Sequence, residues 1–192
     1  MRGFYKLWCI LVYPFFRIVY KINTTGRENI PKGPALVCAN HSAYSDPVIL
    51  AYAFGMNNFM RFMAKIELMR IPVLGYLLKI AGIFGVDRGN SDVNAVKTAM
   101  KTLKSGDKVA MFPEGTRVGD SEDTSAKTGA IMIAARTGVP IVPVYIPRRK
   151  KPFSSVHVVI GEPYMIEKVR GKSEVYSAYA DELMRKIEAL KP

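Results

Sequence analysis

Residues 35–54 read ALVCANHSAYSDPVILAYAF and determine the kind of fold to expect. The short apolar run 35–39 follows a Gly-Pro turn signal, which predicts a buried strand. Pro47 is predicted at the first position of a helix of about two turns that ends with the quoted stretch, with Asp46 as its N-cap. The polar loop between the two elements contains His41, one of only two histidines in the chain.

An alternation of strands and helices continues along the chain. Further strands are predicted at 59–64, 83–86, 108–112, 141–145 and 156–160, and further helices at 72–81, 91–104, 126–136 and 173–190. Ser91 is predicted to cap the second of these helices. The alternation indicates a single α/β domain with a mixed, largely parallel β-sheet flanked by helices. Functional loops of such sheets gather at the carboxyl ends of the strands, and three polar motifs of this chain fall there.

The charge of the chain limits the classes of partner to consider. It has 28 Lys and Arg against 16 Asp and Glu, a formal net charge of +12 over 192 residues. A surface of this kind attracts polyanions, which include nucleic acid, an anionic membrane leaflet and a phosphorylated substrate. Cys9 and Cys38 lie in apolar surroundings without metal-ligand spacing, so they are predicted to be buried thiols.

The N-terminal stretch MRGFYKLWCILVYPFFRIVYK is apolar but short. As a helix, residues 7–20 would extend about 21 Å at ~1.5 Å per residue, less than the ~30 Å of a hydrocarbon core. No small-x-small cleavage site follows, which argues against a signal peptide. We therefore predict an amphipathic membrane-interface helix over 1–22, followed by the globular domain over 23–192. An ordinary N-terminal core helix is the alternative.

Two other segments are candidates for contact with a membrane. Residues 68–84 are rich in apolar residues with interspersed cations. They are predicted either to extend the interfacial surface or to belong to the core. The basic run RRKK at 148–151 is interpreted as a second contact or as a solvated loop.

His41 and Asp46 form a candidate acid–base pair. The loop between them can bring the carboxylate to the imidazole ring, where it accepts a ring N–H and leaves the other nitrogen free as a base. The chain has no Gly-x-Ser-x-Gly nucleophile elbow, and neither cysteine has a suitable setting. The base would therefore activate a hydroxyl of a substrate. In the alternative interpretation Asp46 only caps a helix and His41 is only a turn residue.

A second polar motif, PEGTR, follows the strand predicted at 108–112. Arg117 can bind a phosphate with two parallel hydrogen bonds, Thr116 can donate to it, and the N–H of Gly115 is accessible. Glu114 can accept from a polyol hydroxyl or orient the arginine. The alternative is a turn that ends in a solvated arginine. A second arginine at a strand end, in the sequence GIFGVDRG, argues against that alternative.

Four motifs occur in an order that resembles the glycerophospholipid acyltransferase family, and the lysophosphatidate acyltransferases in particular. They are NHSAYSD, GIFGVDR, FPEGTR and VPIVPV. The similarity extends from about residue 26 to residue 163. Any one motif is weak evidence, but four in order at suitable spacing are specific.

The resemblance implies a role for each matching residue. His41 is expected to be the general base, and Asp46 to orient it. The activated oxygen then attacks an acyl thioester directly, without an acyl-enzyme. Arg88 and the residues from Glu114 to Arg117 are expected to bind the glycerol phosphate. Lys65, which lies outside the motifs, is a candidate for oxyanion stabilisation or donor contact. The alternative for Lys65 is an ordinary surface lysine.

The implied reaction is acyl transfer to the sn-2 hydroxyl of 1-acyl-glycerol-3-phosphate, which gives phosphatidic acid. The co-substrate would be acyl carrier protein or coenzyme A carrying the acyl group, with no cofactor. Two histidines without a cluster of carboxylates argue against a metal site. The expected location is the cytoplasmic face of the cell membrane, as a peripheral or monotopic protein among anionic lipids. Glycerol 3-phosphate or another lysolipid is the alternative acceptor.

Two other classes of function fit the sequence less well than an acyltransferase. A nucleic-acid-binding domain predicts a contiguous basic stripe with stacking aromatic residues. In this chain the aromatic residues concentrate in the apolar N-terminus instead. A catalytically silent relative is disfavoured because His41, Asp46, Glu114 and Arg117 are all present. His157 alternates with apolar residues on a predicted strand and is interpreted as structural.

Overall fold

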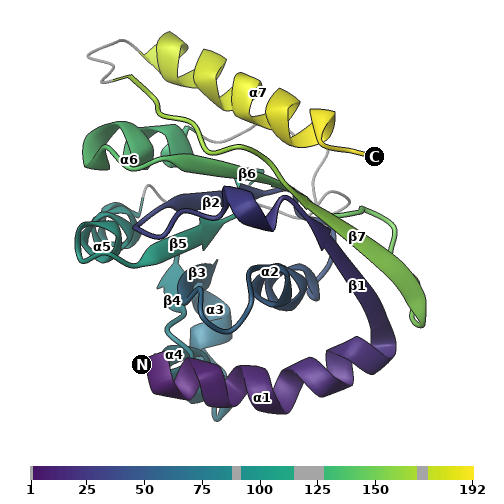
Figure 1. Cartoon of the computed structure of the whole chain (residues 1–192). Coiled ribbons are helices and arrows are strands. Elements are labelled where there is room, and N and C mark those ends of the chain that lie inside the picture. The colour runs from purple at the N-terminus through teal and green to yellow at the C-terminus, as the bar shows by residue number, and fades with distance from the viewer. Residues whose placement is uncertain (1, 88–91, 115–127, 168–172) are drawn as a thin grey trace.

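The computed structural model describes residues 2–87, 92–114, 128–167 and 173–192. The strands are β1 (Tyr20–Thr25), β2 (Leu36–Ala39), β3 (Met60–Lys65), β4 (Phe84–Val86), β5 (Lys108–Met111), β6 (Ile141–Tyr145) and β7 (Ser154–Ile160). The helices are α1 (Arg2–Val19), η1 (Arg27–Asn29), α2 (Asp46–Phe54), α3 (Ile66–Arg70), α4 (Leu74–Ile80), α5 (Val93–Lys104), α6 (Gly129–Thr137) and α7 (Ser173–Ala189). Figure 1 shows how they are arranged.

The strands form one seven-stranded sheet in the order β1-β7-β6-β2-β5-β3-β4. Each pairing between named strands is parallel except that of β6 with β7, which is antiparallel. The central strands β2 and β6 are buried along their whole length, as expected for strands that are covered on both faces. The prediction of a single α/β domain with a mixed, largely parallel sheet is confirmed.

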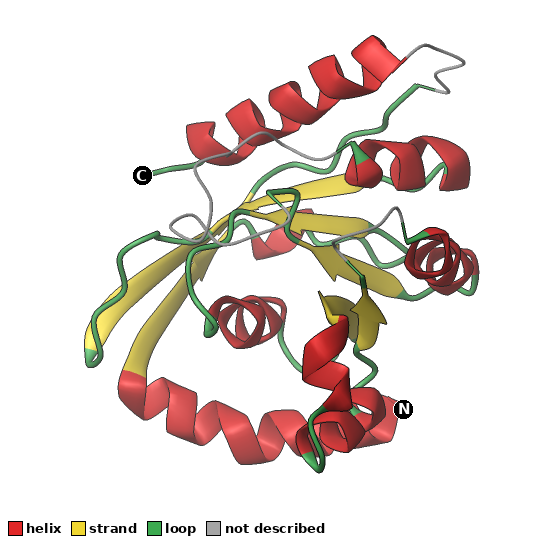
Figure 2. Cartoon of the chain, turned by 180° about the vertical axis from the view of Figure 1, so that it is seen from behind, coloured by secondary structure: helices red, strands yellow, loops and turns green. Residues whose placement is uncertain are grey.

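Helices cover both faces of this sheet (Figure 2). Side chains of β2 alternate between two apolar cores: Val37 and Ala39 face α1 and α2, whereas Leu36 and Cys38 face α5, α6 and α7. Helix α2 lies between the sheet and α1, and α7 packs on the opposite side of the molecule. Both cysteines are buried free thiols, as predicted.

The N-terminal segment differs from its prediction at one end. The predicted helix over 1–22 ends at Val19, and residues 20–22 belong to β1, a strand that was not predicted. Strand β1 runs parallel to β7, with Ile22 opposite Val156. Its side chains alternate between half-buried and exposed, which is typical of an edge strand. Among the helices described, none is long and apolar enough to cross a bilayer.

Two predicted helix caps are corrected by the structure. Helix α5 begins at Val93, and Asp92 is its N-cap because its carboxylate accepts the N–H of Ala95 at 2.9 Å. The predicted cap, Ser91, lies outside the described residues. Helix α2 begins at Asp46, which was predicted to be its cap; Ser45 precedes the helix and makes no side-chain cap. The carboxylate of Asp46 is therefore available for other partners.

Candidate active site

The loop after β2 is fixed at its first residue. Asn40 is fully buried and forms two hydrogen bonds with the backbone of Ile146, just beyond β6. Its side-chain amide donates to the carbonyl oxygen at 2.7 Å, and its side-chain oxygen accepts the N–H at 2.8 Å. The residue after this anchor is His41. Sequence reasoning did not single out Asn40, because its partner lies 106 residues away.

The His41 ring is held between a carboxylate and an aromatic ring. Its Nδ1 lies 3.0 Å from Oδ2 of Asp46, and its face stacks on Phe112 with ring centroids 4.1 Å apart. The same Oδ2 accepts the backbone N–H groups of Ser42 and Ala43, at 2.7 and 2.8 Å. An ionised carboxylate can only accept hydrogen bonds, so Nδ1 carries the proton and Nε2 is left as the basic nitrogen.

Asp46 is kept ionised although it is completely buried. Burial by itself raises the pKa of this carboxyl. The hydrogen bond from His41, the charge of Lys150 and the N–H of Ser42 outweigh burial, so the pKa of Asp46 is lowered below its ordinary value of 3.8. The predicted pairing of His41 with Asp46 is thus present in the structure, with the geometry of a base and its orienting carboxylate.

Lys150 reaches the same carboxylate from the segment after β6. Its Nζ lies 2.8 Å from Oδ1 of Asp46, and its side chain is 2% exposed. The interpretation of RRKK at 148–151 as a solvated loop or a second membrane contact is therefore wrong for this lysine. It is also wrong for Arg148, whose guanidinium pairs with Glu114 and with Glu188 of α7. Composition alone cannot distinguish a buried lysine from a solvated one.

Both carboxylate oxygens of Glu114 bond to groups of the protein itself. Its Oε2 accepts the backbone N–H of His41 at 2.9 Å, and its Oε1 lies 3.0 Å from Nη2 of Arg148. Glu114 therefore fixes the position of His41 and orients an arginine, although this arginine is not the one that the sequence pointed to. Its predicted contact with substrate stays a prediction. The remaining predicted ligands, Arg88, Gly115, Thr116 and Arg117, lie outside the described residues.

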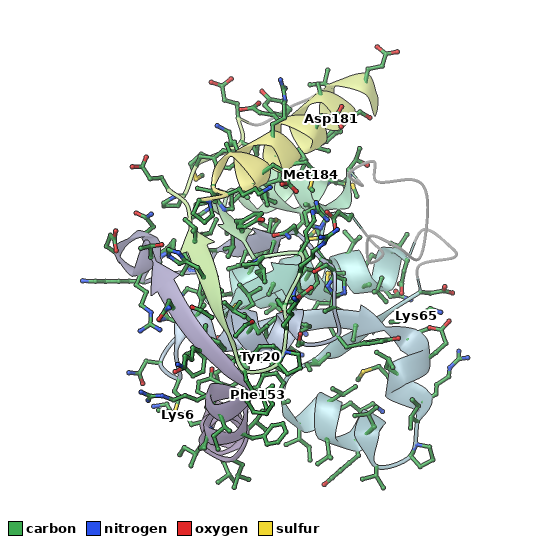
Figure 3. All side chains as sticks on the ribbon, turned by 90° about the vertical axis from the view of Figure 1, so that its right-hand side faces the viewer. Lys6, Tyr20, Lys65, Phe153, Asp181 and Met184 are labelled. Carbon is green, nitrogen blue, oxygen red and sulfur yellow. The ribbon has the colours of Figure 1, made fainter. Side chains whose placement is uncertain are left out.

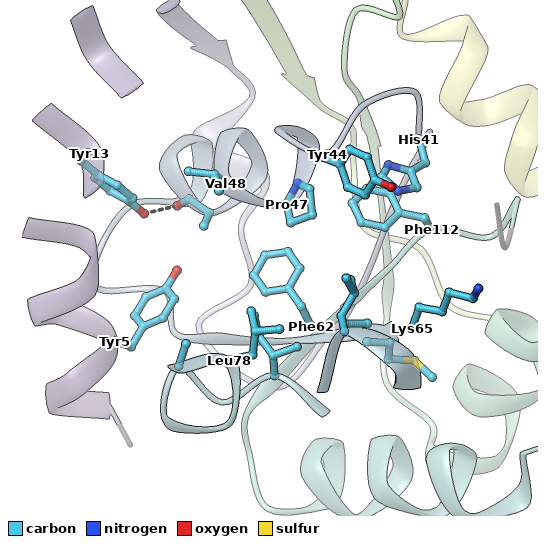
Figure 4. A pocket seen from close by; sticks show the side chains of 16 residues that line it. Tyr5, Tyr13, His41, Tyr44, Pro47, Val48, Phe62, Lys65, Leu78 and Phe112 are labelled. Carbon is cyan, nitrogen blue, oxygen red and sulfur yellow. Dashed lines mark hydrogen bonds between the residues drawn. The ribbon is translucent and has the colours of Figure 1, made fainter. Parts of the chain in front are cut away.

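An apolar pocket of about 480 Å³ extends from His41 toward α1 (Figure 4). His41 and Phe112 line one end, and Tyr5 and Tyr13 of α1 line the other. Between them the wall comes mainly from apolar side chains of α2, β3 and α4. The hydroxyl of Tyr13 donates to the carbonyl of Ala51 in α2 at 2.6 Å, which ties α1 to the pocket wall.

Lys65 lines this pocket at the end of β3, but its ammonium is turned away from His41 in Figure 4. The ammonium pairs with Glu67 at 3.3 Å, and both side chains are more than half exposed. An oxyanion role for Lys65 stays a prediction. His157 lies on β7 and contacts the hydroxyl of Thr25 at 2.9 Å, in keeping with its structural interpretation.

Comparison with known proteins connects this geometry to one family. A sequence model of the family described as Acyltransferase matches residues 21–147. The chloroplastic 1-acyl-sn-glycerol-3-phosphate acyltransferase LPAT1 of Arabidopsis thaliana is 38% identical over 72% of this chain and 38% of its own length. The enzyme of the same name from Borreliella burgdorferi is 31% identical over 89% of this chain and 73% of its own.

The crystal structure of the 1-acyl-sn-glycerophosphate acyltransferase PlsC from Thermotoga maritima has the same fold. It superposes with a TM-score of 0.71 and 27% sequence identity, and covers 98% of this chain and 79% of its own. The chain spans less than half the length of the chloroplast relatives it matches and about three quarters of the bacterial ones from Borreliella burgdorferi and Bacillus subtilis.

Proposed function

This chain belongs to the Acyltransferase family, and we propose that it transfers a fatty acyl group from a thioester to the sn-2 hydroxyl of 1-acyl-sn-glycerol 3-phosphate. The product is phosphatidic acid, and the thiol carrier is released. The observation that carries the proposal is a histidine–aspartate pair at one end of an apolar pocket. The names of the relatives at 31–38% identity support the choice of acceptor.

The chemistry follows from the orientation of the imidazole. Nε2 of His41 takes the proton from the acceptor hydroxyl, and the oxygen of that hydroxyl attacks the thioester carbonyl at the same time. Asp46 stabilises the imidazolium that forms, because its ionised carboxylate lies 3.0 Å from Nδ1. Collapse of the tetrahedral intermediate breaks the carbon–sulfur bond, and the leaving thiolate takes the proton back from Nε2. No covalent bond to the protein is needed.

We assign the apolar pocket to a fatty acyl chain. Its volume of about 480 Å³ falls in the range of ligand pockets, and its lining is mainly hydrophobic. An acyl carbonyl placed beside His41 directs the hydrocarbon tail toward Tyr5 and Tyr13. The donor is then acyl carrier protein or coenzyme A, either of which presents the same thioester.

The phosphate of the acceptor is assigned to arginines near the carboxyl ends of the strands. Strands β2, β5, β3 and β4 are adjacent and parallel, so their carboxyl ends share one edge of the sheet. His41 follows β2 and Glu114 follows β5 at this edge. Arg88 and Arg117 follow β4 and β5 in sequence, which supports their assignment to the phosphate.

We propose that α1 and a second segment, residues 71–76, which runs from the end of α3 into the first turn of α4, rest on an anionic membrane leaflet. Large apolar side chains are exposed on both: Leu7, Ile10, Leu11, Phe15 and Ile18 on α1, and Ile71, Val73, Leu74 and Tyr76 on the second segment. The two elements lie on the same side of the molecule in Figures 1 and 2. Figure 3 shows Lys6 and Phe153 near this side and Asp181 of α7 far from it. The acyl pocket is lined by residues of α1 and α4, so it adjoins the proposed contact surface.

An assay of the purified chain in detergent micelles tests the proposal. Each donor is crossed with 1-acyl-glycerol-3-phosphate, glycerol 3-phosphate and a lysolipid without a phosphomonoester. We expect His41→Ala to abolish acyl transfer while the circular dichroism spectrum is unchanged, and His157→Ala, the matched control, to remain active. Turnover near the wild-type rate in His41→Ala would show that His41 is not the base. Preference for glycerol 3-phosphate would overturn the choice of acceptor.

A further inference from the structure

The segment after β6 contributes a buried, charge-paired ammonium to the site. The Nζ of Lys150 pairs with Oδ1 of Asp46 at 2.8 Å, donates to Oγ of Ser42 at 2.8 Å, and donates to the carbonyl oxygen of Pro147 at 2.6 Å. Two of the three ammonium donors are thus used in hydrogen bonds, and the charge is paired with the carboxylate. A lysine is rarely buried unless its charge is compensated, and the compensating group here is the carboxylate that orients His41.

Two carboxylates contact His41, and the same short segment supplies a cation to each. Asp46 of α2 bonds the ring, and its charge is matched by Lys150. Glu114, which follows β5, bonds the His41 backbone, and its charge is matched by Arg148. One face of the imidazole is covered by Phe112, which stacks on it. The only other charged side chain in the described lining of the pocket is Lys65, which pairs with Glu67.

We propose that Lys150 is a positioning residue that fixes Asp46 in place and offsets its charge, so that the imidazole of His41 stays neutral and able to accept a proton. This inference rests on the proposed role of His41 as base. An uncompensated carboxylate beside a histidine favours the imidazolium form, and an imidazolium cannot accept the acceptor's proton. Lys150 opposes this effect twice, by neutralising Asp46 and as a positive charge near the ring.

The contacts of Asp46 show why the loss of Lys150 acts on His41. Without the ammonium, Oδ2 still accepts from His41 Nδ1 and from the N–H groups of Ser42 and Ala43. These three donors do not depend on the ammonium, and hydrogen bonds to a carboxylate favour its ionised form. The uncompensated charge then falls on the imidazole. The expected loss of activity is therefore greatest at low pH and is recovered as the pH rises.

Nitrogen NMR of the imidazole rings measures this effect directly, because the chain has only two histidines, His41 and His157. The full chain is labelled at histidine, titrated in detergent micelles, and compared with Lys150→Met. We expect the His41 midpoint to move upward by about one pH unit and the acid limb of kcat/KM to move with it. The His157 midpoint stays in place and serves as an internal reference. Lys150→Arg, which keeps the charge, should restore the His41 midpoint at least in part.

Lys151→Met is the matched control, since it removes the same charge from an exposed neighbour and should leave the His41 midpoint unchanged. If circular dichroism shows that Lys150→Met is unfolded, Lys150→Gln takes its place, because it removes the charge but keeps a donor for Asp46. The His41 midpoint in Lys150→Gln is then the test of the inference. An unmoved His41 midpoint in a folded variant overturns the inference. A moved midpoint in a protein that shows no acyl transfer with any donor overturns the proposed function and leaves the inference about Lys150 standing.

Discussion

Replacing Glu114 separates two roles for this carboxylate, that of a substrate ligand and that of a support for His41. Glu114 is 3% exposed and bonds the His41 N–H and the Arg148 guanidinium. Glu114→Ala removes both bonds and leaves a buried N–H without a partner. A hydrogen bond to a charged group contributes about 1.5–3 kcal/mol. Arg148 is one-third exposed and still pairs with Glu188 in the variant. The loss of its ion pair with Glu114 therefore lowers the free energy of unfolding by less.

We therefore expect Glu114→Ala to lower the free energy of unfolding by about 3 kcal/mol. In a domain of this size that corresponds to a fall in Tm of roughly 6–12 °C. Glu114→Gln keeps an acceptor for the His41 N–H and should lose only about 1 kcal/mol. Because the base is displaced, kcat should fall in Glu114→Ala while the KM for the phosphate lipid changes little.

Thermal unfolding followed by circular dichroism and steady-state kinetics in detergent micelles measure both effects. Arg117→Ala serves as the comparison, since a phosphate ligand should show the opposite pattern, with a raised KM for the phosphate lipid and an unchanged Tm. The reasoning about Glu114 is refuted if Glu114→Ala melts with the wild type and raises that KM instead.

Two further predictions concern the membrane surface and the acid range. Paired Leu11→Asp and Phe15→Asp substitutions on the exposed face of α1 should release the protein from anionic vesicles in a sedimentation assay without lowering its Tm; undiminished sedimentation would place the contact elsewhere. The pKa of Asp46 is lower in the folded protein than its ordinary 3.8, so its contribution to stability is present above pH 3.8 and is lost as the pH falls through the folded value. Asp46→Asn should therefore show a flatter dependence of unfolding free energy on pH below about 4 than the wild type, and equal slopes would contradict the assignment of the lowered pKa.

The pattern of residues along the chain was sufficient to predict the order and type of most elements. Strand β6 matches its prediction in full, and β2 and β5 each differ by one residue at an end. Alternating apolar runs and amphipathic segments report local burial, which is why they can be read without a structure. The two errors at the N-terminus, the extended helix and the missed β1, have one cause. Strand β1 is half-buried at a sheet edge, and its weak alternation follows an apolar helix without a break.

The pairing of His41 with Asp46 was also accessible from sequence, because five residues and a helix start bring the two side chains together. The distant groups that hold and charge-balance this pair could not be predicted from the sequence. Lys150 and Ser42 are 108 residues apart, and Asn40 is 106 residues from Ile146. They meet because β6 lies beside β2 in the sheet. Strand order is decided by packing of the whole domain, so a basic run that reads as solvated becomes a buried counter-charge only in the folded chain.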